Sequence, residues 1–246
     1  MSLLYVVIGL AVAFLAYLAI SRVSLPRKAG NEGIEDKEVA EAFNRISLWP
    51  QFRLLRRMVI RRLGSYHPAG AVVDIGCGPG YLVEAMSRRL PDVCVIGIDY
   101  AKEMVETAKR RAEASDSPNK GTFLEGDVGK IPLGNDSVDF VVSTLSLHHW
   151  SSPIAGFTEI YRVLRPNGQL LVLDLRRDST RMFYCLLCVG QALIVPRALR
   201  KVNEPLGSLL AAYSVAELKG MTEKTPFEEC KVTGGVGWAY VWAGKK

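Results

Sequence analysis

The chain has 246 residues, 49% of them hydrophobic, and its 31 basic side chains outnumber the 25 acidic ones to give a formal net charge of +6. This composition excludes a disordered, collagen-like or disulfide-stapled protein, and the length suits a domain that buries a substantial core. The five cysteines are too scattered for a disulfide framework or a zinc site, so we expect a reducing compartment and no metal.

Residues 3–20 form a run of eighteen residues without a charged or strongly polar side chain. As a helix this run is about 27 Å long, close to the thickness of a bilayer's hydrocarbon core. It is apolar on every side and lacks the basic start of a signal peptide. Because Arg22, Arg27 and Lys28 follow it, we expect a single-pass transmembrane helix with the rest of the chain in the cytoplasm.

Residues 21–36 contain Pro26, Gly30 and Gly33 among polar side chains, a composition that predicts a linker. The folded domain is then expected over residues 37–246. The three basic residues after the apolar run account for half of the net charge, and the remaining 6 − 3 = +3 is too small to indicate a nucleic-acid partner.

Two helices are expected next, over residues 38–48 and 51–63. The second carries five arginines and no acid beside an apolar stripe that includes Phe52, Leu55 and Val59. Such a helix close to a membrane binds anionic headgroups. The same pattern also arises when a helix packs its stripe on a domain and leaves its charges in water. Both interpretations remain open.

Beyond Gly70 short apolar runs alternate with helical stretches. This alternation predicts an α/β fold with a doubly wound, mostly parallel sheet that has helices on both faces. The expected strands are 71–75, 93–98, 122–124, 138–145 and 169–173, and the expected helices between them are 81–90, 102–114 and 154–164. Such sheets bind ligands at the carboxyl ends of their strands, so the residues just after each strand are the informative ones.

The first strand runs through Asp74 into a turn with glycine at every second position, Gly76, Gly78 and Gly80. Glycine lets the backbone approach a ligand where a Cβ would collide. A nicotinamide-dinucleotide fingerprint needs a sixth-position glycine where this chain has Tyr81, so that pattern fails. The Asp74 carboxylate would repel a pyrophosphate and suits an ammonium group.

Two more acids follow the next two strands. Asp99 closes the second strand, where a carboxylate can accept hydrogen bonds from both hydroxyls of a ribose, and Asp127 follows the third, where it can accept from the amine of adenine. Each alone is more often a turn or cap residue. Together with Asp74 they predict one cleft for a cation, a ribose and an adenine.

The segments VVDIGCGPGYL, IDYAKEM, EGDVGKIPLGNDSVDFVVSTLSLHHW and RVLRPNGQLLVLD resemble those of class I S-adenosylmethionine-dependent methyltransferases of the ubiquinone/menaquinone C-methyltransferase-like group. The resemblance implies a Rossmann-like seven-stranded sheet ending in an antiparallel hairpin, for which 229–233 and 238–242 are suitable strands. It implies S-adenosyl-L-methionine as the cofactor. The residues implied to bind it are Asp74, Gly76, Cys77, Gly78, Gly80, Asp99, Tyr100, Asp127, Val128 and Ser143.

Methyl transfer from a sulfonium is an in-line displacement, so the enzyme mainly holds the nucleophile near the methyl carbon. A base is needed only when the nucleophile arrives protonated. His149, and after it His148, follow the fourth strand at the mouth of the expected cleft and are our candidates for a general base. A histidine that packs the end of the strand or bonds a carbonyl is the alternative.

Residues 176–225 are long for a crossover and contain an apolar helix over 182–195 with arginines on both sides. We interpret them as a possible substrate cap that touches a membrane surface, or as an ordinary buried crossover. With the apolar N-terminal run, this favours a small lipophilic acceptor (a quinol, a phenol or a lipid-like molecule) and membrane lipid as partners. The oligomeric state is not predicted.

Two other functions compete with this one. An NAD-dependent oxidoreductase is disfavoured by Tyr81 and Asp74, and a catalytically silent nucleoside-binding membrane scaffold is disfavoured by the complete set of turn glycines and acids.

Overall fold

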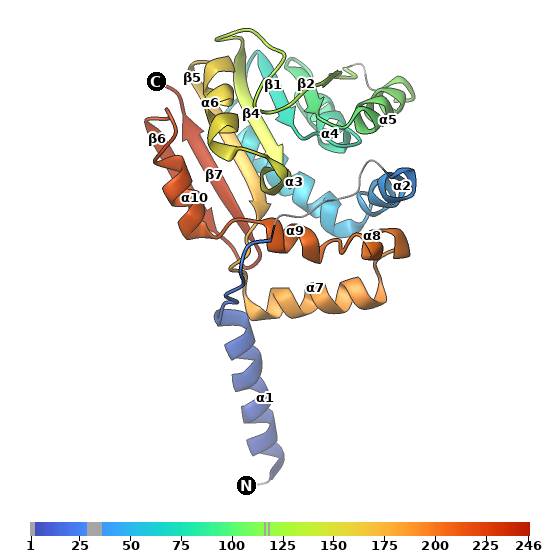
Figure 1. Ribbon diagram of the computed structural model, residues 1–246, viewed down its shortest axis with the longest axis vertical. Helices are drawn as coiled ribbons and strands as arrows, with labels where there is room; N and C mark the ends of the chain where they lie inside the picture. Colours follow the sequence, from blue (N-terminus) through green and yellow to red (C-terminus); the bar gives the residue numbers. More distant parts are fainter. Residues whose placement is uncertain (1–2, 29–35, 116, 118) are drawn as a thin grey trace.

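A computed structural model describes residues 3–28, 36–115, 117 and 119–246. Its centre is a seven-stranded sheet with the strand order β3-β2-β1-β4-β5-β7-β6 (Figure 1). Neighbouring strands from β3 to β5 are parallel, and β7 is antiparallel to both β5 and β6. The predicted Rossmann-like, mostly parallel sheet is therefore confirmed. The strands are β1 Ala71–Ile75, β2 Cys94–Asp99, β3 Thr122–Glu125, β4 Val138–Thr144, β5 Leu164–Leu175, β6 Glu229–Gly234 and β7 Trp238–Gly244.

Helices cover both faces of the sheet because its inner strands carry buried apolar residues on both faces. Successive residues of a strand point to opposite faces. Val72 thus packs in a core cluster with α3 (Pro50–Gly64), α4 (Tyr81–Arg89) and α5 (Lys102–Glu113). Val73 packs in a second cluster, to which α6 (Pro153–Val163) and α10 (Val215–Thr222) contribute.

The arginine-rich helix α3 packs on the domain. Val59 and Leu63 on its apolar stripe are fully buried. The Arg62 guanidinium lies over the Tyr240 ring, with 4.8 Å between Cζ and the ring centroid. The stripe therefore belongs to the core, as the second interpretation of this helix expects.

The first helix, α1 (Leu3–Ile20), projects away from the sheet and touches α7 (Arg181–Leu193) (Figure 1). Among the described residues, no helix combines the length and the apolar character needed to cross a membrane. The predicted transmembrane helix at residues 3–20 and the single-pass membrane topology are therefore wrong.

Residues 21–28, predicted as a linker, lie against the domain. The Val23 amide donates to the Ser179 carbonyl at 3.0 Å, and Arg27 Nε donates to the Ala211 carbonyl at 2.7 Å. The Val23 side chain is buried. Of the rest of the predicted linker, residues 29–35 lie outside the described residues, and Asp36 caps the N-terminus of α2 (Lys37–Ile46).

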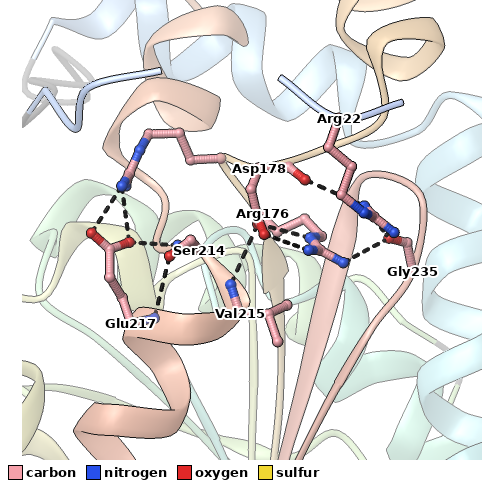
Figure 2. A network of polar contacts seen from close by, with 8 residues as sticks. Arg22, Arg176, Asp178, Ser214, Val215, Glu217 and Gly235 are labelled. Carbon is pink, nitrogen blue, oxygen red and sulfur yellow. Dashed lines mark hydrogen bonds and ion pairs between the residues drawn. The ribbon is translucent and has the colours of Figure 1, made fainter. Parts of the chain in front are cut away.

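Two buried arginines after β5 hold this junction together (Figure 2). Arg176 pairs with the Asp178 carboxylate through Nε and Nη2, at 2.9 and 2.5 Å. Arg177 contacts both carboxylate oxygens of Glu217 at 2.8 and 3.0 Å, and donates to the Leu25 carbonyl at 2.7 Å. Paired and bidentate contacts compensate the cost of burying these two charges.

Glu217 also closes the N-terminus of α10, because its carboxylate accepts the Ser214 amide at 2.6 Å in a capping box. Burial alone would raise the pKa of Glu217, but the hydrogen bonds from Arg177 and Ser214 lower it to about 2. A lowered pKa means that the carboxylate stabilises the fold above pH 4.5 and that this contribution is lost as the pH falls from 4.5 towards 2.

We expect Glu217→Gln to lower the free energy of unfolding by about 1 kcal/mol at pH 7, a value reduced for the partial exposure of this side chain. The difference from the parent protein should shrink as the pH falls below 4.5. Urea denaturation at pH 7, 5 and 3 measures it. Glu223→Gln, at the other end of the same helix, is the control. A deficit that stays constant down to pH 3 would contradict this assignment.

Residues 176–225 contain four helices, α7, α8 (Arg197–Lys201), α9 (Leu206–Ala211) and α10. An apolar cluster joins α8 to α2, with Val39, Ala42, Ile46, Val195, Ala198 and Leu199 as its buried members. Through α2 this region supports one edge of the cavity described next.

Candidate functional site

A cavity of about 960 Å³ opens at the carboxyl ends of β1, β2, β3 and β4. Its floor comes from the turns that follow these four strands, and its outer edge comes from α2 and α3. Among the described residues that line it, none belongs to 176–225, so α2 and α3 occupy the place that the sequence analysis gave to a cap. Parallel α/β sheets bind ligands at this edge.

The turn after β1 forms one wall of the cavity and depends on glycine. Gly80 has φ +79°, and a Cβ on it would lie 2.9 Å from both Ala108 and Phe123. Gly76 has φ +72°, and a Cβ there would collide with the Ser146 side chain. Both positions therefore require a residue without a side chain, and the backbone of this turn lies bare against the cavity.

Asp74 lies at the end of β1 with only 1% of its surface exposed, and it lines the cavity. Its Oδ1 atom has no hydrogen-bond partner among the described residues. Burial, and after it the nearby charge of Asp99, raise the pKa of Asp74 well above its usual value. A buried carboxylate without a partner is costly, and a cation placed beside it removes that cost.

Asp99 organises the turn from the neighbouring strand. Its carboxylate accepts the Gly78 amide at 2.7 Å and the Ala101 amide at 2.9 Å. The side chain thereby ties the glycine turn to the start of α5.

The other predicted cofactor residues fall at different depths. Tyr100, Asp127 and Val128 line the cavity, and Tyr100 is 75% exposed. Asp127 Oδ1 accepts the Gly129 amide at 2.6 Å. Cys77 lines the cavity too, and burial raises the pKa of its thiol, which therefore stays protonated near neutral pH.

Two predicted cofactor residues do not line the cavity, Gly80, which is buried in the turn after β1, and Ser143. Ser143 is fully buried in β4, and its hydroxyl donates to the Ile75 carbonyl at 2.8 Å across the sheet. The predicted strand 138–145 ends at Thr144, and the chain turns through Leu145 at φ +53°. Thr144, Leu145 and Ser146 line the cavity instead.

The two histidines differ in position. His149 lines the cavity, whereas His148 is buried behind it and its Nδ1 lies 2.6 Å from Asp174 Oδ1. Asp174 also accepts the His148 amide at 2.9 Å. The two imidazole centroids are 3.8 Å apart. Sequence reasoning missed Asp174 because it lies at the end of β5 and meets His148 only in the fold.

Sequence reasoning also missed Arg56 of α3, which lines the cavity with Phe43, Phe52 and Leu55. The pattern offered one signal. Arg56 stands at the i+4 position from Phe52 and next to Leu55, so it lies at the border of the apolar stripe.

Comparison with known proteins identifies the central part of the chain. Residues 73–172 match the family described as "Methyltransferase domain". Over 132 residues the chain is 29% identical to the "Ubiquinone/menaquinone biosynthesis C-methyltransferase UbiE" of Geotalea daltonii. The aligned region covers 53% of this chain and 56% of that protein. It is 32% identical over 155 residues to the "Malonyl-[acyl-carrier protein] O-methyltransferase" of Serratia marcescens, with 61% and 58% covered. The chain thus spans little more than half the length of these relatives.

The fold is shared with solved structures. A crystal structure of the plantazolicin methyltransferase BpumL, in complex with a monoazolic desmethylPZN analog and SAH, superimposes with a TM-score of 0.70 at 16% identity. The superposition covers 87% of this chain and 92% of that one.

Proposed function

The chain carries a class I S-adenosylmethionine-dependent methyltransferase domain with S-adenosylmethionine as its cofactor, and from this premise we propose its reaction. The protein transfers a methyl group to a small lipophilic acceptor, such as a quinol, a phenol or a lipid-like molecule. The observation that carries the methyltransferase function is the buried Asp74 carboxylate beside a glycine turn, whose Oδ1 has no hydrogen-bond partner among the described residues. The relatives do not favour a nicotinamide-dependent oxidoreductase or a silent scaffold.

The residues of the cavity fit the cofactor. Asp74 suits the ammonium of its methionine part, and the bare backbone at Gly76 and Gly78 lets that part lie close. Asp99 suits the ribose hydroxyls, and Asp127 with the Val128 amide suits the adenine edge. The sulfonium supplies an activated methyl group with its own leaving group. What the chain contributes is orientation and exclusion of water.

We propose His149 as the general base for an acceptor that arrives protonated, since it lines the cavity. His148 is a positioning residue in this proposal, because Asp174 fixes its ring and that ring lies against His149. His149→Ala should lower kcat by about 10²-fold or more while the affinity for S-adenosylhomocysteine stays unchanged. Equal turnover by the variant would show that no base is used.

The acceptor's lipophilic character is supported by two features. The cavity edge is apolar at Phe43, Phe52 and Leu55. Helix α7 contributes no buried residue, and the exposed fractions of Leu186 and Leu193 reach 64% and 79%. We propose that this face of α7 meets a membrane surface from which the acceptor comes, because such amphipathic helices bind lipid interfaces.

The test is incubation of the purified protein with isotopically labelled methyl donor and lipid extract, followed by identification of the labelled product by mass. We expect one lipophilic product. Vesicle-bound and water-soluble acceptors are then compared, and Leu186→Glu should slow only the former. A labelled product confined to the water-soluble fraction would contradict the lipophilic acceptor, and failure to bind S-adenosylhomocysteine would contradict the function itself.

A further inference from the structure

The cavity holds a positive charge that the cofactor site described above does not use. Arg56 lines it from α3, half-buried, and its Nη1 donates to the Ser47 carbonyl of the preceding turn at 2.8 Å. Among the described residues no carboxylate forms an ion pair with Arg56. The Ser47 carbonyl therefore holds the guanidinium in place, and a bound anion could pair with its positive charge.

Two arginines and one acid lie close enough to act on the charge of Arg56. Burial lowers the pKa of Arg56, as do the neighbouring Arg53 and Arg111, whereas Tyr81 and Glu84 raise it. The group stays charged at neutral pH. The guanidiniums of Arg111 and Arg56 both approach the Tyr81 ring, with Cζ 3.5 and 5.1 Å from its centroid. Glu84, the acid that acts on Arg56, is engaged by Arg111 and Arg88.

The start of α4 reinforces this charge. Tyr81 is the first residue of α4, and Gly80 at the N-cap offers no side chain to accept the first amides. Helix N-termini carry a partial positive charge that favours anions. An arginine in the cavity and an uncapped helix start on the same side make this wall attractive to an oxyanion.

Arg56 does not belong to the wall that suits the cofactor's ammonium. Arg56 lines the cavity from α3, whereas Asp74 lies at the end of β1. Three apolar side chains line the cavity with Arg56. Phe52 and Leu55 lie at helical spacing on α3, and Phe43 lies on α2. An oxyanion next to an apolar body fits this combination.

We propose that Arg56 forms the specificity site for the acceptor, and that the acceptor is an amphiphile with an oxyanion, such as a carboxylate, beside its apolar part. This inference rests on the proposed function and narrows its acceptor. Phe43, Phe52 and Leu55 contact the apolar part, and the guanidinium binds the oxyanion. The carboxylate of the cofactor itself is the other source of the same chemistry.

A matched pair of ligands tests the proposal. Decanoate and decan-1-ol differ in charge and share their chain, and calorimetric titration into protein saturated with S-adenosylhomocysteine gives both affinities. We expect at least tenfold preference for decanoate in the parent protein. Arg56→Gln should remove that preference, and Arg56→Lys should restore part of it. Arg53→Gln, an exposed neighbour on the same helix, should leave it unchanged.

A second titration identifies the source of the oxyanion. S-adenosylhomocysteine carries a carboxylate and 5′-methylthioadenosine does not. If Arg56→Gln weakens the first and not the second, Arg56 binds the cofactor and the proposal is overturned. It is also overturned if the parent protein shows no preference for decanoate or if Arg56→Gln keeps it. Normal binding of S-adenosylhomocysteine in these cases leaves the proposed function standing.

Discussion

Replacing Asp99 with alanine is expected to weaken S-adenosylhomocysteine binding by about 100-fold or more. The carboxylate accepts the Gly78 and Ala101 amides, so its loss frees the glycine turn as well as removing the acceptor for the ribose. Charge-assisted hydrogen bonds contribute roughly 1.5–3 kcal/mol each, and two of them correspond to the expected loss. Calorimetric titration measures the affinity.

Asp92→Ala is the matched control for this experiment, because Asp92 is exposed and precedes β2, at the opposite end of the strand. The control should bind as the parent does. Circular dichroism should show the same fold in both variants. If Asp99→Ala binds S-adenosylhomocysteine with nearly parental affinity, Asp99 does not bind the ribose.

Replacing Asp74 with asparagine is expected to stabilise the protein and to disable it at the same time. Burial raises the pKa of Asp74, so the fold disfavours the ionised form that the unfolded chain adopts at pH 7. The neutral asparagine should therefore raise the free energy of unfolding by about 1 kcal/mol at pH 7. The same change removes the charge that suits the cofactor's ammonium, and affinity for S-adenosylhomocysteine should fall by about tenfold or more.

The pH dependence gives the sign of the Asp74 effect. Because burial and Asp99 raise its pKa in the fold, the protonated form is favoured there, and its stabilising contribution is complete below pH 3.8 and lost as the pH rises through the raised pKa. Asp74→Asn escapes that loss, so its advantage should grow with pH. Cofactor affinity of the parent should fall as the pH drops through the same range. Denaturation at pH 4 to 8 measures the first trend, and an Asp74→Asn protein that is less stable at pH 8 would contradict the assignment.

The central sheet could be predicted because its strands carry a local signal. Apolar runs such as 71–75 and 138–145 alternate with helical stretches, and the structure places β1 and β4 there within one residue. The acids at the ends of these strands meet at one edge by topology alone, which is why Asp74, Asp99 and Asp127 were predicted to share a cavity and do so.

The rest depended on contacts between distant segments. Because the backbone at Leu145 is left-handed, Ser146 and not Ser143 reaches the cavity. A leucine does not predict this backbone conformation. Asp174 becomes relevant only because β5 lies beside β4. Arg56 reads as one of five arginines on a surface helix until α3 packs on the sheet and turns its border into the cavity.

The hydrogen bond from Arg177 to the Leu25 carbonyl makes the N-terminal segment part of the structure that stabilises the domain. A version of the protein shortened to begin after Lys28 would keep the whole sheet, yet its Arg177 guanidinium would lose an acceptor while remaining largely enclosed. Any comparison of full-length and shortened protein therefore changes the integrity of the C-terminal helices along with the presence of α1. Single substitutions on the surface of α1 separate these two effects, and deletion does not.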